Sequence, residues 1–339
     1  MTHALVTGAT GFVGHHLVKR LNSDGVDVTC LVRGTSKRSK LESLGVSFAI
    51  GDVTDAESLP PALVGVDVVY HVAGLTKSLD SKEMECVNEQ GVRNVAKACA
   101  DQPSPPVLVV VSSLAASGPS QGSQPKRESE PCRPISVYGR SKRAGELAAF
   151  EFADRVPTTI VRPPIVLGEE DADGFQLFGM LRKMRFHLVP SFSNHHFSVI
   201  HADDLALALS LAAEKGSRLS TDPNDATGVY FASADEILTY SELGRMIGRS
   251  VGRPRAWMIH VPMPAVWATG GFNELLAKVQ RKPNILNLDK AREAAAGSWV
   301  CTSERLKQDT GYRPEKTLPE RLQQTVEGYQ EKGWIKITS

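Results

Sequence analysis

The stretch Leu5-Val6-Thr7-Gly8-Ala9-Thr10-Gly11-Phe12-Val13-Gly14 carries three glycines, spaced three apart, between an apolar run and a helical pattern. The apolar run from His3 to Val6 predicts a strand that enters a tight turn and then a helix. We expect Gly8 to adopt a backbone conformation closed to other residues, Gly11 to admit a pyrophosphate, and Gly14 to let helix and strand pack closely. The free amides of the helix N-terminus would face the phosphates. The stretch therefore predicts a dinucleotide-binding turn.

Composition sets the broad class of protein. A chain of 339 residues with 41% hydrophobic content can form one large domain, or one domain with a smaller lobe. The formal net charge of +1 gives no reason to expect a nucleic acid or an acidic membrane surface as partner. Five scattered cysteines, without a C-x-x-C pair, fit a reducing cytoplasm better than a disulfide framework. Because the first residues predict a strand, we expect no signal peptide, and no apolar run reaches the roughly 20 residues of a membrane span.

Short apolar runs alternate with helical patterns through the first half of the chain. We expect strands at residues 27–32, 46–50, 68–71, 107–112 and 158–162, with helices between them, most clearly from Glu85 to Ala100. Several runs are apolar on both faces, which predicts burial between two layers. The fold class is therefore α/β, a doubly wound parallel sheet of the Rossmann type with a smaller C-terminal substrate lobe. We expect a dinucleotide-binding domain over 1–167, with a return segment near 197–232, and a lobe interleaved with it over 168–339.

The residues after the second strand predict which dinucleotide is bound. An acidic residue there would bind the ribose hydroxyls of NAD, but Val32 is followed by Arg33 and then by Lys37 and Arg38. The Arg33 fork suits the 2′-phosphate of NADP, and the other cations add charge unless they are only solvated. We therefore expect NADP in preference to NAD. Asp52, after the third strand, is placed to read the adenine amino group or to cap the next helix.

Polar side chains follow the fifth strand and open a later helix. Ser112-Ser113 end that strand, and Tyr138-Gly139-Arg140-Ser141-Lys142 opens a helical stretch to about Phe152. Tyr138 and Lys142 are four residues apart and therefore share one helix face. A phenol with a pKa of about 10 is a poor acid or base near neutral pH unless a cation stabilises its phenolate. Lys142 would supply that cation and hold the nicotinamide ribose, while Ser113 would bind the substrate oxygen.

These motifs resemble those of the extended short-chain dehydrogenase/reductase superfamily, also called the NAD-dependent epimerase/dehydratase family. The matching segments are residues 8–14, 71–74, 111–113, 138–142, 162–164 and 200–206. The resemblance implies that Tyr138 is the catalytic acid/base, Lys142 its partner and Ser113 the third member, with Asn88 near the active site. It also implies a homodimer formed through the helices that carry Asn88 and Tyr138.

Two departures from the family pattern indicate a branch. Sugar-nucleotide epimerases usually hold a diphosphate with an Asn soon after the Arg of the sixth strand and with an Arg before the segment matching 200–206. This chain has Pro163-Pro164 and Asn194-His195-His196-Phe197-Ser198 at those places, so both anchors are absent. The pattern is more similar to the dihydroflavonol reductase and 3β-hydroxysteroid dehydrogenase branches.

We therefore expect an oxidoreductase that moves a hydride between nicotinamide and a carbonyl or secondary alcohol on an apolar small molecule. A nucleotide-sugar epimerase or dehydratase is one alternative, and a non-enzymatic dinucleotide-sensing scaffold is another. We expect the cofactor to contact residues from every motif. They are Gly8, Thr10, Gly11, Phe12, Val13, Gly14, Arg33, Arg38, Asp52, Val53, Val72, Ala73, Gly74, Asn88, Ser112, Tyr138, Lys142 and Pro164.

Segments outside these motifs carry weaker signals. We expect His71 to be a packed, hydrogen-bonded histidine and not an acid or base. The polar loop from Ser117 to Pro134 is a plausible rim or lid of the site. The acidic residues from Glu169 to Asp173 lack the spacing of a calcium site, so we expect a solvated turn and no metal. The apolar stripe from Phe175 to Met184 predicts a helix over the pocket.

The remaining sequence predicts the rest of the lobe. We expect Asp203 or Asp204 to cap one helix and Thr239 to cap another. The markedly apolar stretch from Met263 to Val279 is compatible with a core or pocket wall, a dimer contact or a membrane surface.

Overall fold

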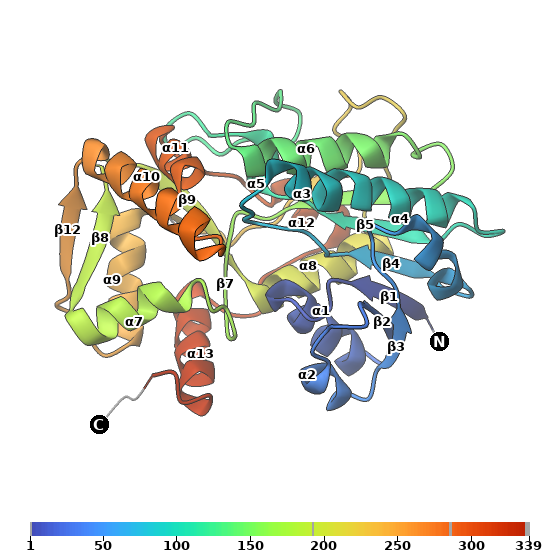
Figure 1. The fold of residues 1–339 in the computed structure, drawn as a ribbon, viewed down its shortest axis with the longest axis horizontal. Helices are drawn as coiled ribbons and strands as arrows, with labels where there is room; N and C mark the ends of the chain where they lie inside the picture. The colour runs from blue at the N-terminus through green and yellow to red at the C-terminus, as the bar shows by residue number, and fades with distance from the viewer. Residues whose placement is uncertain (1, 192, 285–286, 336–339) are drawn as a thin grey trace.

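A seven-stranded parallel sheet forms the centre of the computed structural model, which describes residues 2–191, 193–284 and 287–335 (Figure 1). Its strand order is β10-β6-β5-β4-β1-β2-β3, so the order in which successive strands are added along the sheet reverses between β1 and β4. The strands are β1 (His3–Thr7), β2 (Asp27–Val32), β3 (Ser47–Ile50), β4 (Val68–His71), β5 (Val107–Val111), β6 (Thr158–Arg162) and β10 (Val229–Phe231). The first six match the predicted runs to within one residue at each end. The doubly wound fold is thereby confirmed.

Helices cover both faces of this sheet, because its strands are apolar on both sides. Along β1, Ala4 and Val6 pack in one layer of the core and Leu5 packs in the other. The first layer contains α1 (Phe12–Ser23), α8 (Ala202–Lys215) and α12 (Glu304–Thr310). The second contains α4 (Gly91–Ala100) and α6 (Val137–Phe150), with the short turns η1 (Ala56–Ser58) and η2 (Pro60–Leu63). The short helices α2 (Ser39–Glu42) and α5 (Leu114–Ser117) complete this part.

The helix predicted from Glu85 to Ala100 starts at Ser81 and contains a π-helical turn between two α-helical segments. Its first segment, α3 (Ser81–Glu85), is capped by Asp80, whose carboxylate accepts the Lys82 amide at 2.9 Å. A π-helical turn, η3 (Cys86–Gln90), then joins α3 to α4. Such a turn shifts the residues that follow it around the helix axis and is frequent at functional sites.

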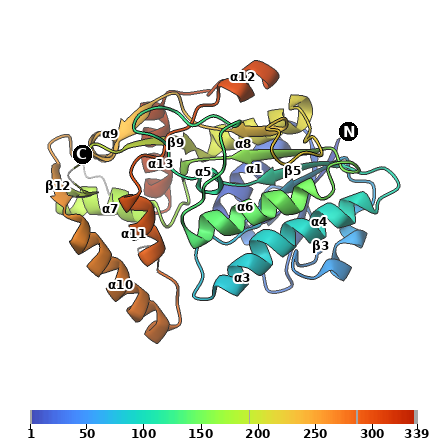
Figure 2. The same cartoon turned by 90° about the horizontal axis from the view of Figure 1, so that it is seen from above.

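Among the residues that the structure describes, the smaller lobe contains two short sheets and five helices (Figures 1 and 2). The strands of its sheets are β7 (Ile165–Leu167), β8 (Phe186–Pro190), β9 (His196–His201), β11 (Ile237–Thr239) and β12 (Trp257–Val261). The helices are α7 (Phe175–Met184), α9 (Tyr240–Ser250), α10 (Met263–Gln280), α11 (Leu288–Ala295) and α13 (Leu318–Glu331). In the part of the chain that the structure describes, no helix combines the length and the hydropathy of a membrane span.

Two expectations for the lobe are wrong. The stripe on α7 does not cover a pocket: Phe178 and Leu181 are fully buried in the lobe core with α13, where Phe178 meets Tyr329 edge to face. Asp203 and Asp204 do not cap α8 either. The N-cap is His201, whose ring accepts the Asp203 amide at 3.2 Å, and the two aspartates lie in the first helical turn.

The turn after β7 is not simply solvated, because its acidic residues contact α2 and α13. Glu170 pairs with Lys40 of α2 and with Lys332 at the C-terminal end of α13. Glu169 accepts a hydrogen bond from Gln324 of α13 at 2.6 Å. The turn therefore ties the C-terminal helix to the N-terminal half of the chain.

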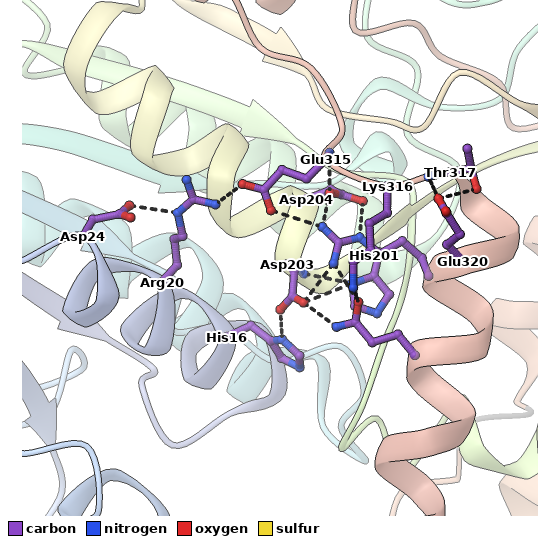
Figure 3. A network of polar contacts seen from close by, with 12 residues as sticks. His16, Arg20, Asp24, His201, Asp203, Asp204, Glu315, Lys316, Thr317 and Glu320 are labelled. Carbon is purple, nitrogen blue, oxygen red and sulfur yellow. Dashed lines mark hydrogen bonds and ion pairs between the residues drawn. The ribbon is translucent and has the colours of Figure 1, made fainter.

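A polar network beside this turn connects α1, α8 and α13 (Figure 3). His16 of α1 contacts Asp203 of α8 at 2.6 Å, and Arg321 of α13 binds Asp204 through two guanidinium nitrogens. Ligand atoms of His16, Glu169 and Asp203 lie within 4.8 Å of one another. These atoms are engaged by each other, by Arg321 and by Gln324, so the cluster is an internal ion-pair network.

Candidate active site

The glycine turn after β1 has the geometry that the sequence predicts. Gly8 has a φ of +71°, and a Cβ there would lie 2.6 Å from the Ala73 nitrogen. A Cβ at Gly14 would lie 2.2 Å from the Gly8 carbonyl oxygen, so only glycine lets α1 approach the turn. Gly8 also accepts the Gly11 amide at 2.9 Å.

The N-terminus of α1 fits a dinucleotide pyrophosphate. Its N-cap residue is Gly11, which has no side chain to satisfy the first amides, and the first turn contains no acidic residue. The amides of Phe12, Val13 and Gly14, which have no carbonyl partner in the helix, and the positive end of the helix dipole therefore face the turn. Val72, Ala73 and Gly74 follow the adjacent strand β4, where small residues leave room for a flat ring. The residues present fit a nicotinamide dinucleotide, which supplies or accepts the hydride when bound.

The residues predicted to bind the adenosine half of the cofactor follow β2 and β3. Arg33 is exposed, and its guanidinium has no ion-pair or hydrogen-bond partner among the described residues. The Arg38 guanidinium lies over the Phe48 ring at 5.7 Å from its centroid. Asp52 accepts the Thr54 amide at 2.9 Å through one carboxylate oxygen, while Asp55, not Asp52, caps the following turn.

Ser113 and Tyr138 meet where β5 ends and α6 begins. Ser113 is the N-cap of α5, and its hydroxyl accepts the Ala115 amide at 3.1 Å. Burial raises the pKa of Tyr138 above that of an ordinary phenol, while a hydrogen bond with Ser113 and the charge of Lys290 lower it. The predicted pair is therefore together, with both side chains half-buried.

Lys142 lies one helical turn from Tyr138 and faces the strand ends. Its ammonium is buried and donates to the Val111 carbonyl at 2.6 Å. A Cβ built on Gly74 would lie 3.4 Å from this ammonium, which places the cation against the small residues after β4. Burial lowers the pKa of Lys142 to about 8, although the nearby Glu146 carboxylate raises it. The Lys142 ammonium therefore lies against the Val111 carbonyl and the loop after β4.

Glu146 is the first site residue that the sequence reasoning missed. It lies one further turn along α6 and is fully buried. Arg162 of β6 donates to its two oxygens at 2.7 Å each, and the Ser112 hydroxyl donates at 2.5 Å. The Ser112 hydroxyl is therefore engaged inside the protein. The repeated four-residue spacing from Tyr138 to Lys142 to Glu146 places all three on one helix face, and it could have identified Glu146 from the sequence.

Asn88 lies in the π-helical turn and bridges two parts of the site. Its amide nitrogen donates to the Leu75 carbonyl at 2.8 Å and to the Ser141 hydroxyl at 2.9 Å, and its oxygen accepts the Leu75 amide at 2.8 Å. His71 is fully buried and contacts the Thr7 hydroxyl at 3.0 Å. Burial lowers the pKa of His71 to about 3, which agrees with a packed, neutral ring.

Two residues of α11 reach the site from the smaller lobe and were not predicted. The Asp289 carboxylate accepts the amides of Val137 and Tyr138 at 2.9 and 3.2 Å. It therefore caps α6 together with the N-cap residue Ser136, whose hydroxyl accepts the Gly139 amide at 2.9 Å. The Lys290 ammonium lies 5.7 Å from the centroid of the Tyr138 ring. No local motif identifies either residue, because both lie about 150 positions away in sequence from the α6 residues that they contact.

The loop predicted to be a rim or lid is held by hydrogen bonds along much of its length. The loop from Ser117 to Pro134 pairs with the segment before α12: Ser120 donates its amide to the Ser298 carbonyl at 2.9 Å, and Lys126 donates to Val300 at 2.9 Å. Its Glu128 carboxylate accepts the Phe231 amide at 3.0 Å. The loop is therefore a fixed rim. Pro164, between β6 and β7, is half-buried.

Comparison with known proteins agrees with this geometry. The model of the NAD dependent epimerase/dehydratase family matches residues 4–223. A ceramide reductase from Caulobacter vibrioides is 29% identical over 97% of this chain and 95% of its own length. A 2-alkyl-3-oxoalkanoate reductase from Shewanella oneidensis is 27% identical over 92% of this chain and 82% of its own. The solved structure of UDP-glucose 4-epimerase from Thermotoga maritima matches with a TM-score of 0.76 at 20% identity, covering 98% and 99% of the two chains.

The chain belongs to the NAD dependent epimerase/dehydratase family, which confirms the resemblance drawn from its motifs. Within that family it is an NAD(P)-dependent oxidoreductase of the extended short-chain type, and it acts on a small molecule.

Proposed function

We propose that this enzyme reduces a carbonyl, or oxidises the matching secondary alcohol, on a long apolar molecule, with NADP as its preferred cofactor. The observation that carries the proposal is the Ser113–Tyr138 pair beside the buried Lys142, at the strand ends where this fold binds its ligands. The names of two relatives support an apolar substrate, because one reduces a ceramide and the other a 2-alkyl-3-oxoalkanoate.

Each residue has a defined part in the reduction. Ser113 donates a hydrogen bond to the carbonyl oxygen and orients it toward Tyr138. Tyr138 would give its proton to the carbonyl oxygen as the C=O π bond breaks, with the hydride for the carbon supplied by the cofactor when bound. Lys142 would hold the nicotinamide ribose, and Asn88 fixes the loop after β4 to α6. Oxidation of the alcohol runs through the same groups in reverse.

NADP preference rests on Arg33. Its guanidinium is exposed and unpartnered among the described residues, as a bidentate phosphate site requires. We expect NADPH to bind more tightly than NADH, and Arg33→Ala to weaken NADPH binding by about tenfold or more, because a charge-assisted contact contributes about 1.5–3 kcal/mol. Titration of cofactor fluorescence measures both affinities. Equal affinities in the wild type would contradict the preference.

Turnover experiments separate the candidate activities. We expect NADPH oxidation with long-chain 3-oxo compounds or 3-ketosteroids and none with UDP-glucose, because the two diphosphate anchors of the sugar-nucleotide enzymes are absent. Tyr138→Phe should abolish turnover and leave NADPH affinity unchanged. UDP-glucose turnover would favour the epimerase alternative instead. A Tyr138→Phe variant that retained every cellular phenotype would favour a dinucleotide-sensing scaffold.

The proposal also covers the oligomeric state and the cellular location of the protein. We propose a homodimer through α4 and α6 and a location in the cytoplasm, with residues 1–167 acting as the cofactor domain and 168–339 supplying most of the substrate lobe. All five cysteines are free in the structure, which supports a reducing compartment.

A further inference from the structure

Helix α10 carries an apolar stripe that no other part of the described protein covers. Phe272, Leu275 and Val279 are 65%, 63% and 75% exposed. With Ala268 they follow spacings of four, three and four residues, which align side chains along one face of a helix. Soluble monomers rarely expose a continuous apolar row of this kind without a binding role.

The opposite face of α10 is the one that packs on the protein. Its buried residues are Gly270 and Ala277, seven positions apart. A Cβ at Gly270 would lie 3.0 Å from the Asn287 carbonyl oxygen and 3.4 Å from Ala291, so α10 rests closely on α11. At 100° per residue, the exposed row lies half a turn from this contact. The row therefore points away from the protein and does not line the active site.

A second apolar surface lies at the same end of the molecule. β8 and β12 pair in parallel, with Leu188 opposite Ile259 and Phe186 opposite Trp257. Trp257 is 75% exposed, and Leu188, Ile259 and the nearby Met184 are exposed as well. Figure 1 places β8, β12 and α10 at the end remote from β1–β3, and Figure 2 shows β12 and α10 far from β3. Exposed Trp next to aliphatic residues is typical of a surface that meets a membrane interface.

The same end of the molecule has a large excess of positive charge. Residues 175–199 contain Arg182, Lys183 and Arg185 and no Asp or Glu. Residues 245–288 contain seven Lys and Arg and one acidic residue, Glu274. The whole chain carries a net charge of only +1, so the remainder is acidic.

These cations border both apolar surfaces. Arg253 donates to the Arg182 carbonyl at 3.3 Å, which places the loop before β12 beside the end of α7. Lys183, Arg185 and Arg255 are exposed there. Lys278, Arg281 and Lys282 are exposed at the C-terminal end of α10.

We propose that the β8–β12 and α10 end of the smaller lobe docks on the surface of a lipid bilayer that contains anionic lipids. Apolar side chains would enter the headgroup region while the surrounding Lys and Arg bind lipid phosphates. A second copy of this chain does not fit the same face, because two such faces would bring a large excess of like charge together. The inference goes beyond the proposed reaction, and its test needs neither cofactor nor substrate.

Co-sedimentation with vesicles tests this docking. The full chain should pellet with vesicles of phosphatidylcholine and phosphatidylglycerol, and stay in the supernatant with phosphatidylcholine alone or at high salt. Phe272→Ser combined with Leu275→Ser should weaken binding by about tenfold or more, because each large apolar side chain contributes strongly when buried. Arg255→Gln combined with Lys282→Gln should weaken it by about fivefold for each charge removed.

Matched variants exclude a general effect of surface change. Val64→Ser removes an apolar side chain that is 73% exposed elsewhere, and Lys19→Gln with Lys215→Gln removes two exposed cations from α1 and α8. Both controls should bind vesicles like the wild type, and all variants should keep the wild-type melting temperature. The proposal is overturned if the wild type ignores anionic vesicles, or if test and control variants bind alike. It is also overturned if Phe272→Ser with Leu275→Ser instead abolishes a dimer measured by sedimentation velocity.

Discussion

The charge that acts on the Tyr138 phenol comes from the smaller lobe. Lys290 lies over its ring, and the charge and hydrogen bond of Glu293 keep the pKa of Lys290 raised against the effect of burial. Because a cation favours the phenolate, Lys290→Gln should raise the pKa of Tyr138 further. In the direction of alcohol oxidation, where Tyr138 must accept a proton, the alkaline rise of kcat/KM should move to higher pH.

Carbon-13 NMR of tyrosine labelled at Cζ measures this titration without substrate. Tyr138→Phe identifies the signal, and Lys19→Gln, which removes an exposed cation on α1, is the control. An unchanged Tyr138 titration in Lys290→Gln would show that the lobe does not tune the phenol.

Glu146 is held as an anion by its surroundings. Burial would raise the pKa of this carboxyl, but the charge of Arg162 and hydrogen bonds from Arg162 and Ser112 leave it lowered. Glu146→Gln leaves Arg162 buried without its counter-charge and should cost about 3–5 kcal/mol of unfolding free energy, measured in urea. Glu151→Gln, which breaks a more exposed pair with Arg93, should cost less than about 1 kcal/mol. Similar losses in the two variants would contradict this account.

At this scale the sequence predicted the residues that belong to local motifs and missed those that act across the chain. Gly8, Ser113 and Tyr138 could be proposed because strand ends and helix spacing place them, and their roles in the site stay a prediction. Lys290 was missed because its position depends on how α11 packs. Lys142 was found, but its contact with the Val111 carbonyl depends on side-chain packing that spacing alone does not determine.

Helix α11 also acts on α6 through its carboxylate. Asp289 accepts two amides at the start of the helix that carries Tyr138, so Asp289→Ala should cost about 0.5–2 kcal/mol of stability, as loss of an N-cap does. It should also lower kcat, because the phenol is no longer held by the lobe. Asp80→Ala removes the cap of α3 and should cost similar stability with little change in kcat. An unchanged kcat in Asp289→Ala would limit its role to stability.

His16 makes the junction between α1 and α8 sensitive to pH. Both of its ring nitrogens face acceptors, Asp203 at 2.6 Å and the Glu169 carbonyl at 2.9 Å, so only the doubly protonated ring satisfies both. Burial lowers the pKa of His16, but these contacts raise it by more, to a net value above 6.5. The stabilisation is therefore complete below pH 6.5 and is lost as pH rises through the raised pKa.

Urea unfolding at a series of pH values tests this junction. The wild type should lose about 1–3 kcal/mol more than His16→Asn as pH rises above neutrality, because one buried hydrogen bond is left unmade. His15→Asn is the control: burial lowers the pKa of His15, so its removal leaves the alkaline loss intact. Parallel pH profiles for the wild type and His16→Asn would refute the assignment.

Prediction of elements succeeded where periodicity was clear. Six strands were located because each is a short apolar run, and all of them except β3 are buried on both faces. Thr239 was identified as a cap because its capping box is local. β7 and β11, of three residues each, are too short for a period to appear. α10 was left without an assignment because apolar residues occur on nearly all its sides, which hides the amphipathic pattern.

Net charge does not describe how charge is distributed over the whole molecule. A value of +1 gave no reason to expect an acidic membrane surface as partner, and that expectation is untested, but residues 175–199 and 245–288 concentrate cations at one end of the fold. Segments that are distant in sequence meet there only after β8 pairs with β12. Charge distribution, and therefore the partner it favours, depends on topology more than on composition.

The proposed dimer is the remaining property of the whole molecule that a single change can test. α4 and α6 lie side by side (Figure 2), and the ion pair of Arg93 with Glu151 at 2.8 Å joins them at the surface. Leu147 of α6 is 41% exposed on this layer. A two-fold interface across these helices repeats the same face on both copies, so Leu147→Asp places like charges in one contact.

Sedimentation velocity should therefore show a dimer for the wild type and a monomer for Leu147→Asp. Val64→Asp introduces the same charge at a residue that is 73% exposed outside α4 and α6, and it should remain a dimer. Because α10 and β8–β12 lie at another end of the molecule, the Leu147→Asp monomer should still bind anionic vesicles, though more weakly, since a dimer presents two docking faces at once. A wild-type monomer, or a dimer that survives Leu147→Asp, would remove α4 and α6 as the interface.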